Sequence, residues 1–286
     1  MSPPSPLSNA KLAFIGGGNM ASAIIGGLLA RDFDADKIFV AEPWDVNRAK
    51  MAALGVKTTT SNSEVATWAD LVVISVKPQV TQTACQDLAA AWQEFDGEKK
   101  LPLVVSIAAG ITIDSLRAWA TTPGGRVPHV VRVMPNTPAL VGEGASGVYA
   151  GDDITEEERQ LVTQILASVS KATEWVARED LLDVVTGLSG SGPAYFFAMV
   201  EHLITSAVSL GLPVDQASRL AKQTCLGAGK MLVESSEEPG QLRKNVTSPN
   251  GTTHAALVSF EASGLEEIVN KAVSAATKRS VELGKK

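Results

Sequence analysis

The glycine triplet Gly16–Gly18 constrains the fold of this chain more than any other feature. It follows the apolar run Leu12–Ile15 and precedes a helical pattern, so it lies where a strand turns into a helix. Together with Ala21, the first and third glycines match the spacing G-x-G-x-x-A. In this arrangement Gly16 makes a tight turn, Gly18 lets a pyrophosphate approach the backbone, and Ala21 permits close helix–strand packing. The triplet therefore predicts a dinucleotide-binding strand–turn–helix unit.

Strand and helix patterns alternate in the first half of the chain, which predicts βαβ units and a parallel sheet. Beyond about Glu179 the strand patterns end and long helical patterns follow. We expect an α/β fold, with a Rossmann-type doubly wound sheet followed by an all-α domain. The expected domains are a flexible tail over 1–10, a dinucleotide-binding domain over 11–176 and a helical domain over 177–286.

The individual elements are predicted from these patterns and from turn residues between them. The expected strands are Lys11–Ile15, Ile38–Ala41, Val56–Thr58, Leu71–Ser75, Leu103–Ile107 and Val127–Val133. The expected helices are Met20–Arg31, Asp45–Leu54, Ser63–Ala69 with Asn62 or Ser63 as its cap, Tyr195–Leu210, Val214–Ser235, Thr253–Ala262 and Leu265–Leu283.

Composition narrows the class of protein. The chain has 286 residues, 45% of them hydrophobic, which is enough for a sizeable core. The formal net charge of −6 argues against nucleic acid or an anionic membrane as partner. No apolar run reaches the roughly 18 residues of a membrane span. The two cysteines, Cys85 and Cys225, show no metal-binding or redox spacing, which favours a reducing cytoplasm with both thiols in the core.

The three histidines, His129, His202 and His254, lie far apart in the sequence. They form no ligand spacing with one another or with the cysteines, so we expect no metal site. Each histidine is interpreted as a surface or packing residue.

The segment Ser248–Thr253 predicts a polar loop that turns directly into a helix. Pro249 and the pair Asn250-Gly251 are turn residues, and two threonines follow at helix-start positions. A helix that starts in this way presents free backbone N–H groups and hydroxyls, which suit a small carboxylate. The same pattern is also typical of an ordinary capped helix. The chain already has a predicted dinucleotide loop at Gly16–Gly18. Its presence favours the interpretation of Ser248–Thr253 as a ligand-binding loop.

Six segments, taken together, resemble the pyrroline-5-carboxylate reductase family. They occur in the family's order, and the resemblance extends from residue 12 to about residue 282. The first is shared with many dehydrogenases, whereas the last two are specific to the family. One departure is Asn250, where the family often has glycine; asparagine tolerates positive φ better than most residues. The segments are Phe14–Met20, Ser75–Gln79, Ser106–Gly110, Met134–Pro138, Gly187–Tyr195 and Ser248–Ala256.

This resemblance implies the last step of proline biosynthesis, the reduction of 1-pyrroline-5-carboxylate to L-proline. The implied cofactor is NADPH or NADH, without a metal. A protonated cyclic imine accepts hydride at carbon without a protein nucleophile, so the protein must mainly position the nicotinamide and neutralise the carboxylate. The resemblance also implies a homodimer or higher homo-oligomer through the C-terminal helices, which makes 177–286 an all-α substrate and dimerisation domain. In that dimer, the Ser248–Thr253 loop of one subunit would face the nicotinamide held by the other.

Three regions are expected to bind the cofactor. The glycine loop would hold the pyrophosphate, and Ser75–Pro78 follows a strand at the sheet edge where ligands bind. The resemblance places Met134–Pro138 near the nicotinamide and Asn62 near the adenosine. The expected cofactor-binding residues are Ile15, Gly16, Gly17, Gly18, Asn19, Met20, Glu42, Asn62, Ser75, Val76, Lys77, Pro78, Met134 and Asn136.

The choice between the two cofactors stays open at this point. Glu42 ends the second strand, where an acid hydrogen-bonds a ribose 2′-hydroxyl and repels a 2′-phosphate, which favours NADH. Arg48, one turn into the next helix, can instead meet a phosphate, and the family more often uses NADPH.

On the substrate side, Thr253 is the candidate catalytic residue. It resembles the family threonine whose hydroxyl reaches the ring nitrogen, and a hydroxyl can both accept and donate a hydrogen bond. The expected substrate-binding residues are Ser248, Gly251, Thr252 and Thr253. For Gly187–Tyr195 the structural interpretation is preferred, with small residues for close packing and Pro193 at a helix start.

Two alternatives belong to other classes. A reductase of the 3-hydroxyacid dehydrogenase type places a lysine on a long helix, and Lys222 or Lys230 are the candidates, although neither has glycine-rich surroundings. A non-catalytic dinucleotide sensor would need the glycine loop but not Ser248–Thr253.

Overall fold

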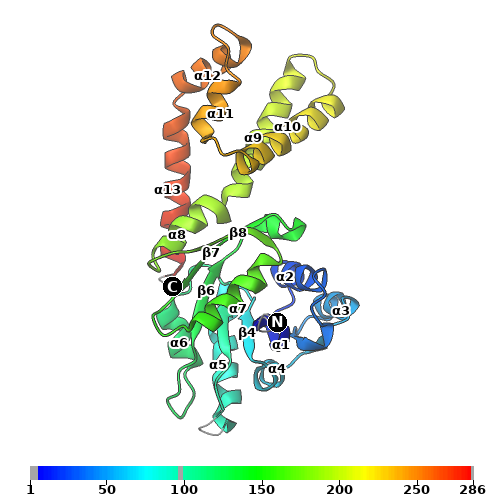
Figure 1. Cartoon of the computed structure of the whole chain (residues 1–286), viewed down its shortest axis with the longest axis vertical. Helices are drawn as coiled ribbons and strands as arrows, with labels where there is room; N and C mark the ends of the chain where they lie inside the picture. Colours follow the sequence, from blue (N-terminus) through cyan, green and yellow to red (C-terminus); the bar gives the residue numbers. More distant parts are fainter. Residues whose placement is uncertain (1–5, 96–98, 285–286) are drawn as a thin grey trace. The chain divides into compact units, whose positions relative to one another are not determined.

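The computed structural model describes residues 6–95 and 99–284, which form two compact units (Figure 1). The first unit runs to Gly190 and also includes the end of the chain from Ala276; the second unit is Ser191–Ala275. Packing thus groups residues 177–190 with the first unit, whereas the sequence pattern places the domain boundary at 177. The division into two independent domains at residue 177 stays a prediction.

The first unit is built on a mostly parallel sheet, as expected. In the described residues its strand order is β3-β2-β1-β4-β5-β6-β7-β8. The strands from β3 to β6 pair in parallel, β7 is antiparallel to β6, and β8 is parallel to β7. The strands are β1 (Leu12–Ile15), β2 (Ile38–Ala41), β3 (Lys57–Thr59), β4 (Leu71–Ile74), β5 (Leu103–Ser106), β6 (Val130–Met134), β7 (Gly144–Ala150) and β8 (Ser170–Trp175).

Helices cover both faces of this sheet, so the central strands are buried on both sides. Successive side chains of a strand point to opposite faces. In β1, Leu12 and Phe14 join one buried cluster, while Ala13 and Ile15 join the other. The first cluster packs against α2 (Asn19–Leu29), α3 (Asp45–Ala53) and α7 (Glu156–Ala167). The second packs against α4 (Asn62–Trp68), α5 (Pro78–Ala91) and α6 (Ile113–Ala120).

Strands β7 and β8 were not expected, because neither has a continuous apolar run. In β7, small residues leave room for other elements: a Cβ on Gly147 would lie 2.7 Å from Cγ1 of Val185. This close approach packs α8 (Leu181–Val185) against the strand. β8 is an edge strand with partly exposed polar residues, so its hydrophobic pattern is weak.

Two local expectations are corrected by the structure. Residues 6–9 form the short helix α1 (Pro6–Asn9), and Leu7 packs against the core, so this part is not a loose tail; residues 1–5 lie outside the described residues. The cap of α4 is Ser61, whose hydroxyl accepts from the Glu64 N–H at 3.3 Å, rather than Asn62 or Ser63. Serine is favoured at this position because it satisfies a free N–H group.

The second unit is helical, and within the described residues the last strand, β8, ends at Trp175. Pro193 occupies the first turn of α9, as expected. The helix α13 continues into the first unit, where the Ser280 hydroxyl donates to Asp183 Oδ1 at 2.5 Å. None of the helices in the described ranges is long and apolar enough to cross a membrane. The helices are α9 (Gly192–Ser209), α10 (Val214–Glu234), α11 (Pro239–Asn245), α12 (Thr252–Ala262) and α13 (Leu265–Gly284).

Candidate functional site

The turn after β1 depends on Gly16. Its φ of +99° lies in the left-handed region, which glycine adopts without strain. A Cβ at this position would also lie 2.9 Å from the Ser75 carbonyl oxygen. The Ser75 hydroxyl fixes the turn, since its oxygen is 3.0 Å from the Ile15 carbonyl oxygen and 2.8 Å from that of Gly16. Gly16 and Ser75 together hold the ends of β1 and β4 close to each other.

Gly18 plays a different part, because it leaves space open. It caps α2 with an extended backbone, and a Cβ built on it meets no described atom within 4 Å. The first N–H groups of an α-helix have no partner inside the helix and carry partial positive charge. The open space in front of Gly18 and the start of α2 therefore fits the diphosphate of a dinucleotide.

Glu42 connects this turn to the end of β2. Its carboxylate is buried, and Oε2 accepts from the Gly17 N–H at 2.7 Å while Oε1 accepts from the Trp44 N–H at 2.9 Å. Arg48, the alternative phosphate ligand, donates to the carbonyl oxygens of Glu42 and Pro43 and pairs with Asp45. Glu42 is thus fixed at the turn, and the Arg48 guanidinium is already engaged.

A pocket of about 450 Å³ opens at the carboxyl ends of β1, β2 and β4. This edge of an open α/β sheet is where ligands bind. The pocket brings together eight of the expected cofactor residues: Ile15, Gly16, Gly18, Glu42, Asn62, Ser75, Val76 and Lys77. It also contains eight residues that were not among the expected cofactor-binding residues: Ala41, Pro43, Trp44, Asn47, Gln79, Val80, Thr83 and Ala84. Most of these directly flank the expected residues, so nearness in sequence was the available signal.

The other expected cofactor residues do not line this pocket. The Gly17 N–H is used by Glu42, and Met20 packs against the core. Pro78 occupies the first turn of α5, where its missing N–H is tolerated. Asn19 begins α2. Their contribution is to shape the turn and the helix starts around the pocket.

Met134 is the last residue of β6 and Asn136 follows the strand, and both contact the segment before α9. The Asn136 side chain donates to the Ser189 carbonyl oxygen at 3.1 Å and accepts from the Ala145 N–H at 2.9 Å. A Cβ on Gly190 would lie 2.6 Å from Met134 Cε. This part of Gly187–Tyr195 packs closely against Met134 and Asn136, which explains why its residues are small. Residues Thr186–Gly190 form a π-helix, a geometry that is frequent at functional sites.

The Ser248–Thr253 loop belongs to the second unit. Asn250 adopts φ +59°, as expected for asparagine in place of glycine. The Gly251 N–H donates to the Ser248 carbonyl oxygen at 3.0 Å, and Gly251 caps α12, which begins at Thr252. Within the described residues, the Thr253 hydroxyl has no hydrogen-bond partner. The loop therefore presents N–H groups and a hydroxyl at one helix start.

Three titratable residues outside these two regions were considered as candidates from the sequence. Burial raises the pKa of the Cys85 thiol to about 12, so this cysteine is not a nucleophile. His129 hydrogen-bonds Glu158 at 2.9 Å. Cys225 is half-buried and lines a pocket of the second unit, so the expectation that it lies in the core is wrong. In the ranges 6–95 and 99–284, no group of three acidic, histidine or cysteine residues has a metal-binding arrangement.

The sheet order, the glycine turn and the pocket define a nucleotide-dependent oxidoreductase with a Rossmann-type domain. In agreement, residues 11–110 match the family model "NADP oxidoreductase coenzyme F420-dependent". Residues 179–283 match the model "Pyrroline-5-carboxylate reductase dimerisation".

Full-length relatives define the family. The chain is 46% identical over 278 residues to a pyrroline-5-carboxylate reductase of Pseudomonas aeruginosa, covering 97% of this chain and 98% of the relative. It is 40% identical to the Pisum sativum enzyme, covering 95% of each chain. The chain belongs to the pyrroline-5-carboxylate reductase family, as the six segments predicted.

Solved structures agree with this assignment. A pyrroline-5-carboxylate reductase from Coxiella burnetii aligns with a TM-score of 0.88 and 37% identity, covering 97% of this chain and 99% of the other. A pyrroline carboxylate reductase from Plasmodium falciparum with NADP bound aligns with a TM-score of 0.82 and 29% identity, with the same coverage. The likeness includes both the sheet and the helical segment.

Proposed function

We propose that this protein reduces 1-pyrroline-5-carboxylate to L-proline with NADPH or NADH, as the last step of proline biosynthesis. The observation that carries the proposal is the pocket at the glycine turn, in a chain whose relatives share its full length. A cytoplasmic location is part of the proposal, because Cys85 and Cys225 are both free thiols.

The reaction requires the protein to position the reactants and to stabilise their charges. When bound, a reduced nicotinamide would supply the hydride, which the carbon of the N-protonated imine would accept. The start of α2, with its free N–H groups at Gly18–Met20, binds the diphosphate, and Ser75–Lys77 lines the next part of the pocket. Met134 and Asn136 keep the segment after β6 in place beside this edge of the sheet. The first unit thus holds the cofactor.

The Ser248–Thr253 loop binds the substrate in this proposal. Ser248 and the N–H groups of Gly251–Thr253 bind the carboxylate, because a helix start favours an anion. The Thr253 hydroxyl accepts a hydrogen bond from the iminium N–H and donates one to the neutral amine of the product. Thr253 is therefore the catalytic residue, in the sense that it contacts the reacting group.

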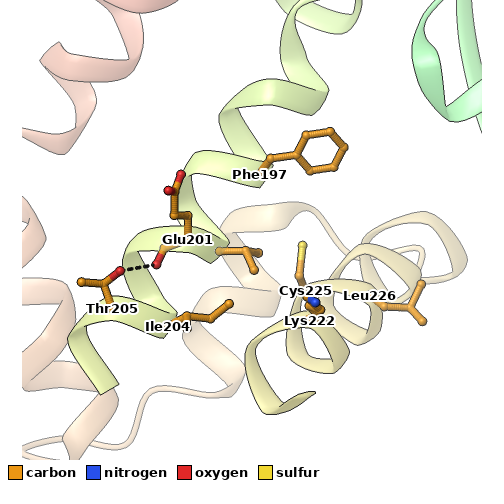
Figure 2. A pocket seen from close by; sticks show the side chains of 8 residues that line it. Phe197, Glu201, Ile204, Thr205, Lys222, Cys225 and Leu226 are labelled. Carbon is orange, nitrogen blue, oxygen red and sulfur yellow. Dashed lines mark hydrogen bonds between the residues drawn. The ribbon is translucent and has the colours of Figure 1, made fainter. Parts of the chain in front are cut away.

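We propose that the second unit forms the dimer interface. Figure 2 shows the pocket between α9 and α10, with Ile204 pointing from α9 towards α10. Its volume is about 630 Å³, and most of its lining is apolar, including Phe197 and Leu226. Such a surface on a folded chain marks an interaction site. A partner's helices would cover it, which leaves Lys222 in this pocket as an interface residue rather than an acid or base.

The first experiment measures NAD(P)H oxidation with pyrroline-5-carboxylate. Gly18→Asp should abolish cofactor binding while the protein remains folded, because the new side chain fills the space for the diphosphate and repels it. Thr253→Ala should lower turnover about ten- to a hundredfold with nearly unchanged NAD(P)H affinity, since a hydrogen bond to a charged group contributes about 1.5–3 kcal/mol. Thr252→Ser, which keeps a hydroxyl at the neighbouring position, is the matched control.

A wild-type protein that binds NAD(P)H but does not oxidise it with this substrate would contradict the proposal. That result would favour the dinucleotide sensor. Unchanged kinetics in Thr253→Ala would instead mean that the loop is only a helix start.

Subunit mixing tests whether each active site is shared between chains. A Gly18→Asp subunit is combined with a Thr253→Ala subunit, and each alone has little activity. If the sites are shared, every mixed dimer contains one intact site, so random mixing should restore about a quarter of the wild-type activity. If each site lies within one chain, every site keeps a defect. No recovery in mixed dimers of proven composition would refute sharing and leave the reductase proposal standing.

A further inference from the structure

We propose that Trp44 is the stacking platform for the cofactor's adenine and that Glu42 makes the pocket select NADH over NADPH. This inference rests on the proposed function, because it concerns the cofactor of that reaction. It assigns the adenosine end of the pocket, to which the catalytic groups do not extend.

Trp44 differs from the other four tryptophans of the chain, because most of its side chain is exposed. It is 71% exposed, and it lines the nucleotide pocket directly after β2. The others have partners: the ring of Trp68 packs edge-on against Phe39, and Trp92 is buried. The backbone of Trp44 is fixed, since its N–H donates to Glu42 and the residue caps α3. The pocket therefore has a large aromatic side chain at its wall, held at its base and open to a ligand.

A nucleobase is the ligand chemistry that fits this side chain. A base has a flat aromatic face, and stacking on an aromatic residue does not require a particular hydrogen-bond pattern. Trp44 follows the second strand of a Rossmann-type sheet, on the side of the glycine turn where the adenosine half of a dinucleotide binds. The neighbouring lining residue Asn47 offers a neutral amide group to the adenosine, and Asn62, whose Nδ2 donates to Asp87 Oδ2 at 2.8 Å, offers its amide oxygen.

The position of Glu42 decides which ribose the pocket accepts. The side chain is 6% exposed, and each carboxylate oxygen accepts one backbone N–H, so the carboxylate is held in one place at the pocket wall. Each oxygen keeps a further lone pair, which can accept from a ribose hydroxyl. A 2′-phosphate at the same point would bring negative charge against the carboxylate.

No positive charge among the lining residues compensates for this repulsion on the Glu42 side. Arg48 does not line the pocket, and its guanidinium contacts two carbonyl oxygens and Asp45. Lys77, the lysine in the lining, follows β4, whereas Glu42 follows β2, and β1 lies between these two strands. Lys77 is therefore placed for the diphosphate rather than for a 2′-phosphate.

The test is direct binding to the full-length protein without substrate. Titration calorimetry gives Kd for NADH and NADPH, and for ADP-ribose and its 2′-phosphate, which lack the nicotinamide. NADH should bind about tenfold or more tightly than NADPH, with the same order for the two fragments. A decrease in tryptophan emission on binding of ADP-ribose that is absent in Trp44→Ala provides a second readout.

Four variants separate the two residues, and a fifth is the control. Trp44→Ala should weaken NADH and NADPH alike, about five- to a hundredfold, whereas Trp44→Phe should retain most of the affinity. Glu42→Gln should reduce the preference for NADH without abolishing binding. Asp45→Asn releases Arg48 and should strengthen NADPH only. Val46→Ala removes an exposed apolar side chain that does not line the pocket, so it should leave every Kd unchanged.

Each result has a definite meaning. Equal or tighter binding of NADPH by the wild type overturns the role of Glu42 and leaves the reductase proposal intact. Unchanged affinities in a folded Trp44→Ala protein overturn the stacking platform. Binding of neither cofactor contradicts the proposed function, and this inference fails with it. If Glu42→Gln does not fold, Asp45→Asn and the wild-type fragments still decide the preference.

Discussion

The two units of this chain bury their apolar residues very differently. The first unit contains both buried clusters, which enclose the sheet from its two sides. Among the described residues of the second unit, Ala217 is the buried hydrophobic residue, with 2% of its surface exposed. Its helices instead expose large apolar side chains, such as Phe197 at 68% and Leu226 at 55%.

This difference indicates that the two units are stabilised in different ways. A sheet between two helix layers buries its apolar residues within one chain. The second unit has no sheet, and its helices leave apolar surface that a single folded chain rarely exposes. The first unit is therefore complete as a nucleotide-binding body, whereas the second is completed by association. The following predictions test this contrast, from the largest effect to the smallest.

The largest effect is expected for charges on the second unit. Phe197→Asp with Leu226→Asp removes two apolar anchors of about 2 kcal/mol or more each and places charges in the covered surface. The dimer dissociation constant should rise more than about a thousandfold, measured by analytical ultracentrifugation. Val141→Asp changes an exposed apolar residue of the first unit and should not alter the mass. An intact dimer in the double variant would place the interface elsewhere.

A matched pair of isoleucines compares the two kinds of packing. Ile24 is fully buried in the first unit, and Ile24→Ala should cost about 2–5 kcal/mol whatever the protein concentration. Ile268, on α13 in the second unit, is exposed in the single chain. Ile268→Ala should therefore lower the stability only by weakening association. Thermal unfolding at several protein concentrations separates the two. Equal, concentration-independent losses would contradict the contrast.

The pH dependence of stability tests a charge held within the first unit. Burial favours a raised pKa for Glu158, but hydrogen bonds from Lys100, the Thr155 N–H and His129 outweigh it, and the pKa falls from 4.5 to about 2. A lowered folded-state pKa contributes stability above the unfolded-state value, which is lost as pH falls from about 4.5 to about 2. Because the Lys100 side chain is largely exposed and solvent screens its charge, the contribution at neutral pH is on the order of 1 kcal/mol.

Glu158→Gln should remove this contribution, so its unfolding free energy should change less than that of the wild type across the same pH range. Glu267 is the control, because its pair with Lys271 is exposed on a helix and is worth about 0–1 kcal/mol. Chemical unfolding at pH 7 and pH 3 measures both. The same pH profile for the wild type and Glu158→Gln would refute the assignment.

The smallest effects concern backbone conformation, where the two units should behave alike. Asn250 in the second unit and Asp32 in the first both have positive φ, at +59° and +61°. Replacing either by alanine should cost about 1–2 kcal/mol, and glycine should be close to neutral. Denaturation of the four variants checks this. A larger cost for Asn250→Ala than for Asp32→Ala would mean that the Ser248–Thr253 loop also affects association.

Patterns of local origin were predictable. The runs that form β1, β4 and β5 are apolar because both faces of the sheet are covered, and the positive φ of Gly16 follows from the turn that its spacing requires. β7 and β8 lack such runs. Glycine is needed at position 147 because Val185, which lies far away in the sequence, packs closely against it.

The candidate site shows the same division. The glycine loop and Ser75–Lys77 were identified by their motifs, and the fold brings them to one pocket. The exposure of Trp44, the two N–H groups that hold Glu42 and the engagement of Arg48 had no signal in the sequence. Which partner a side chain finds depends on elements that meet only after folding.

The sequence by itself determined the alternation of strands and helices, the change to helices alone after Glu179, the glycine turn and the family. These properties depend on residue spacing and on backbone conformations that each short segment specifies for itself. Only the tertiary structure decided that the carboxylate of Glu42 is held by Gly17 and Trp44, that α8 packs on β7 and that the second unit leaves its apolar side chains uncovered. The physical reason is that burial and hydrogen-bond partnership are properties of pairs of segments, and the chain brings those pairs together only when the sheet and its helices are assembled.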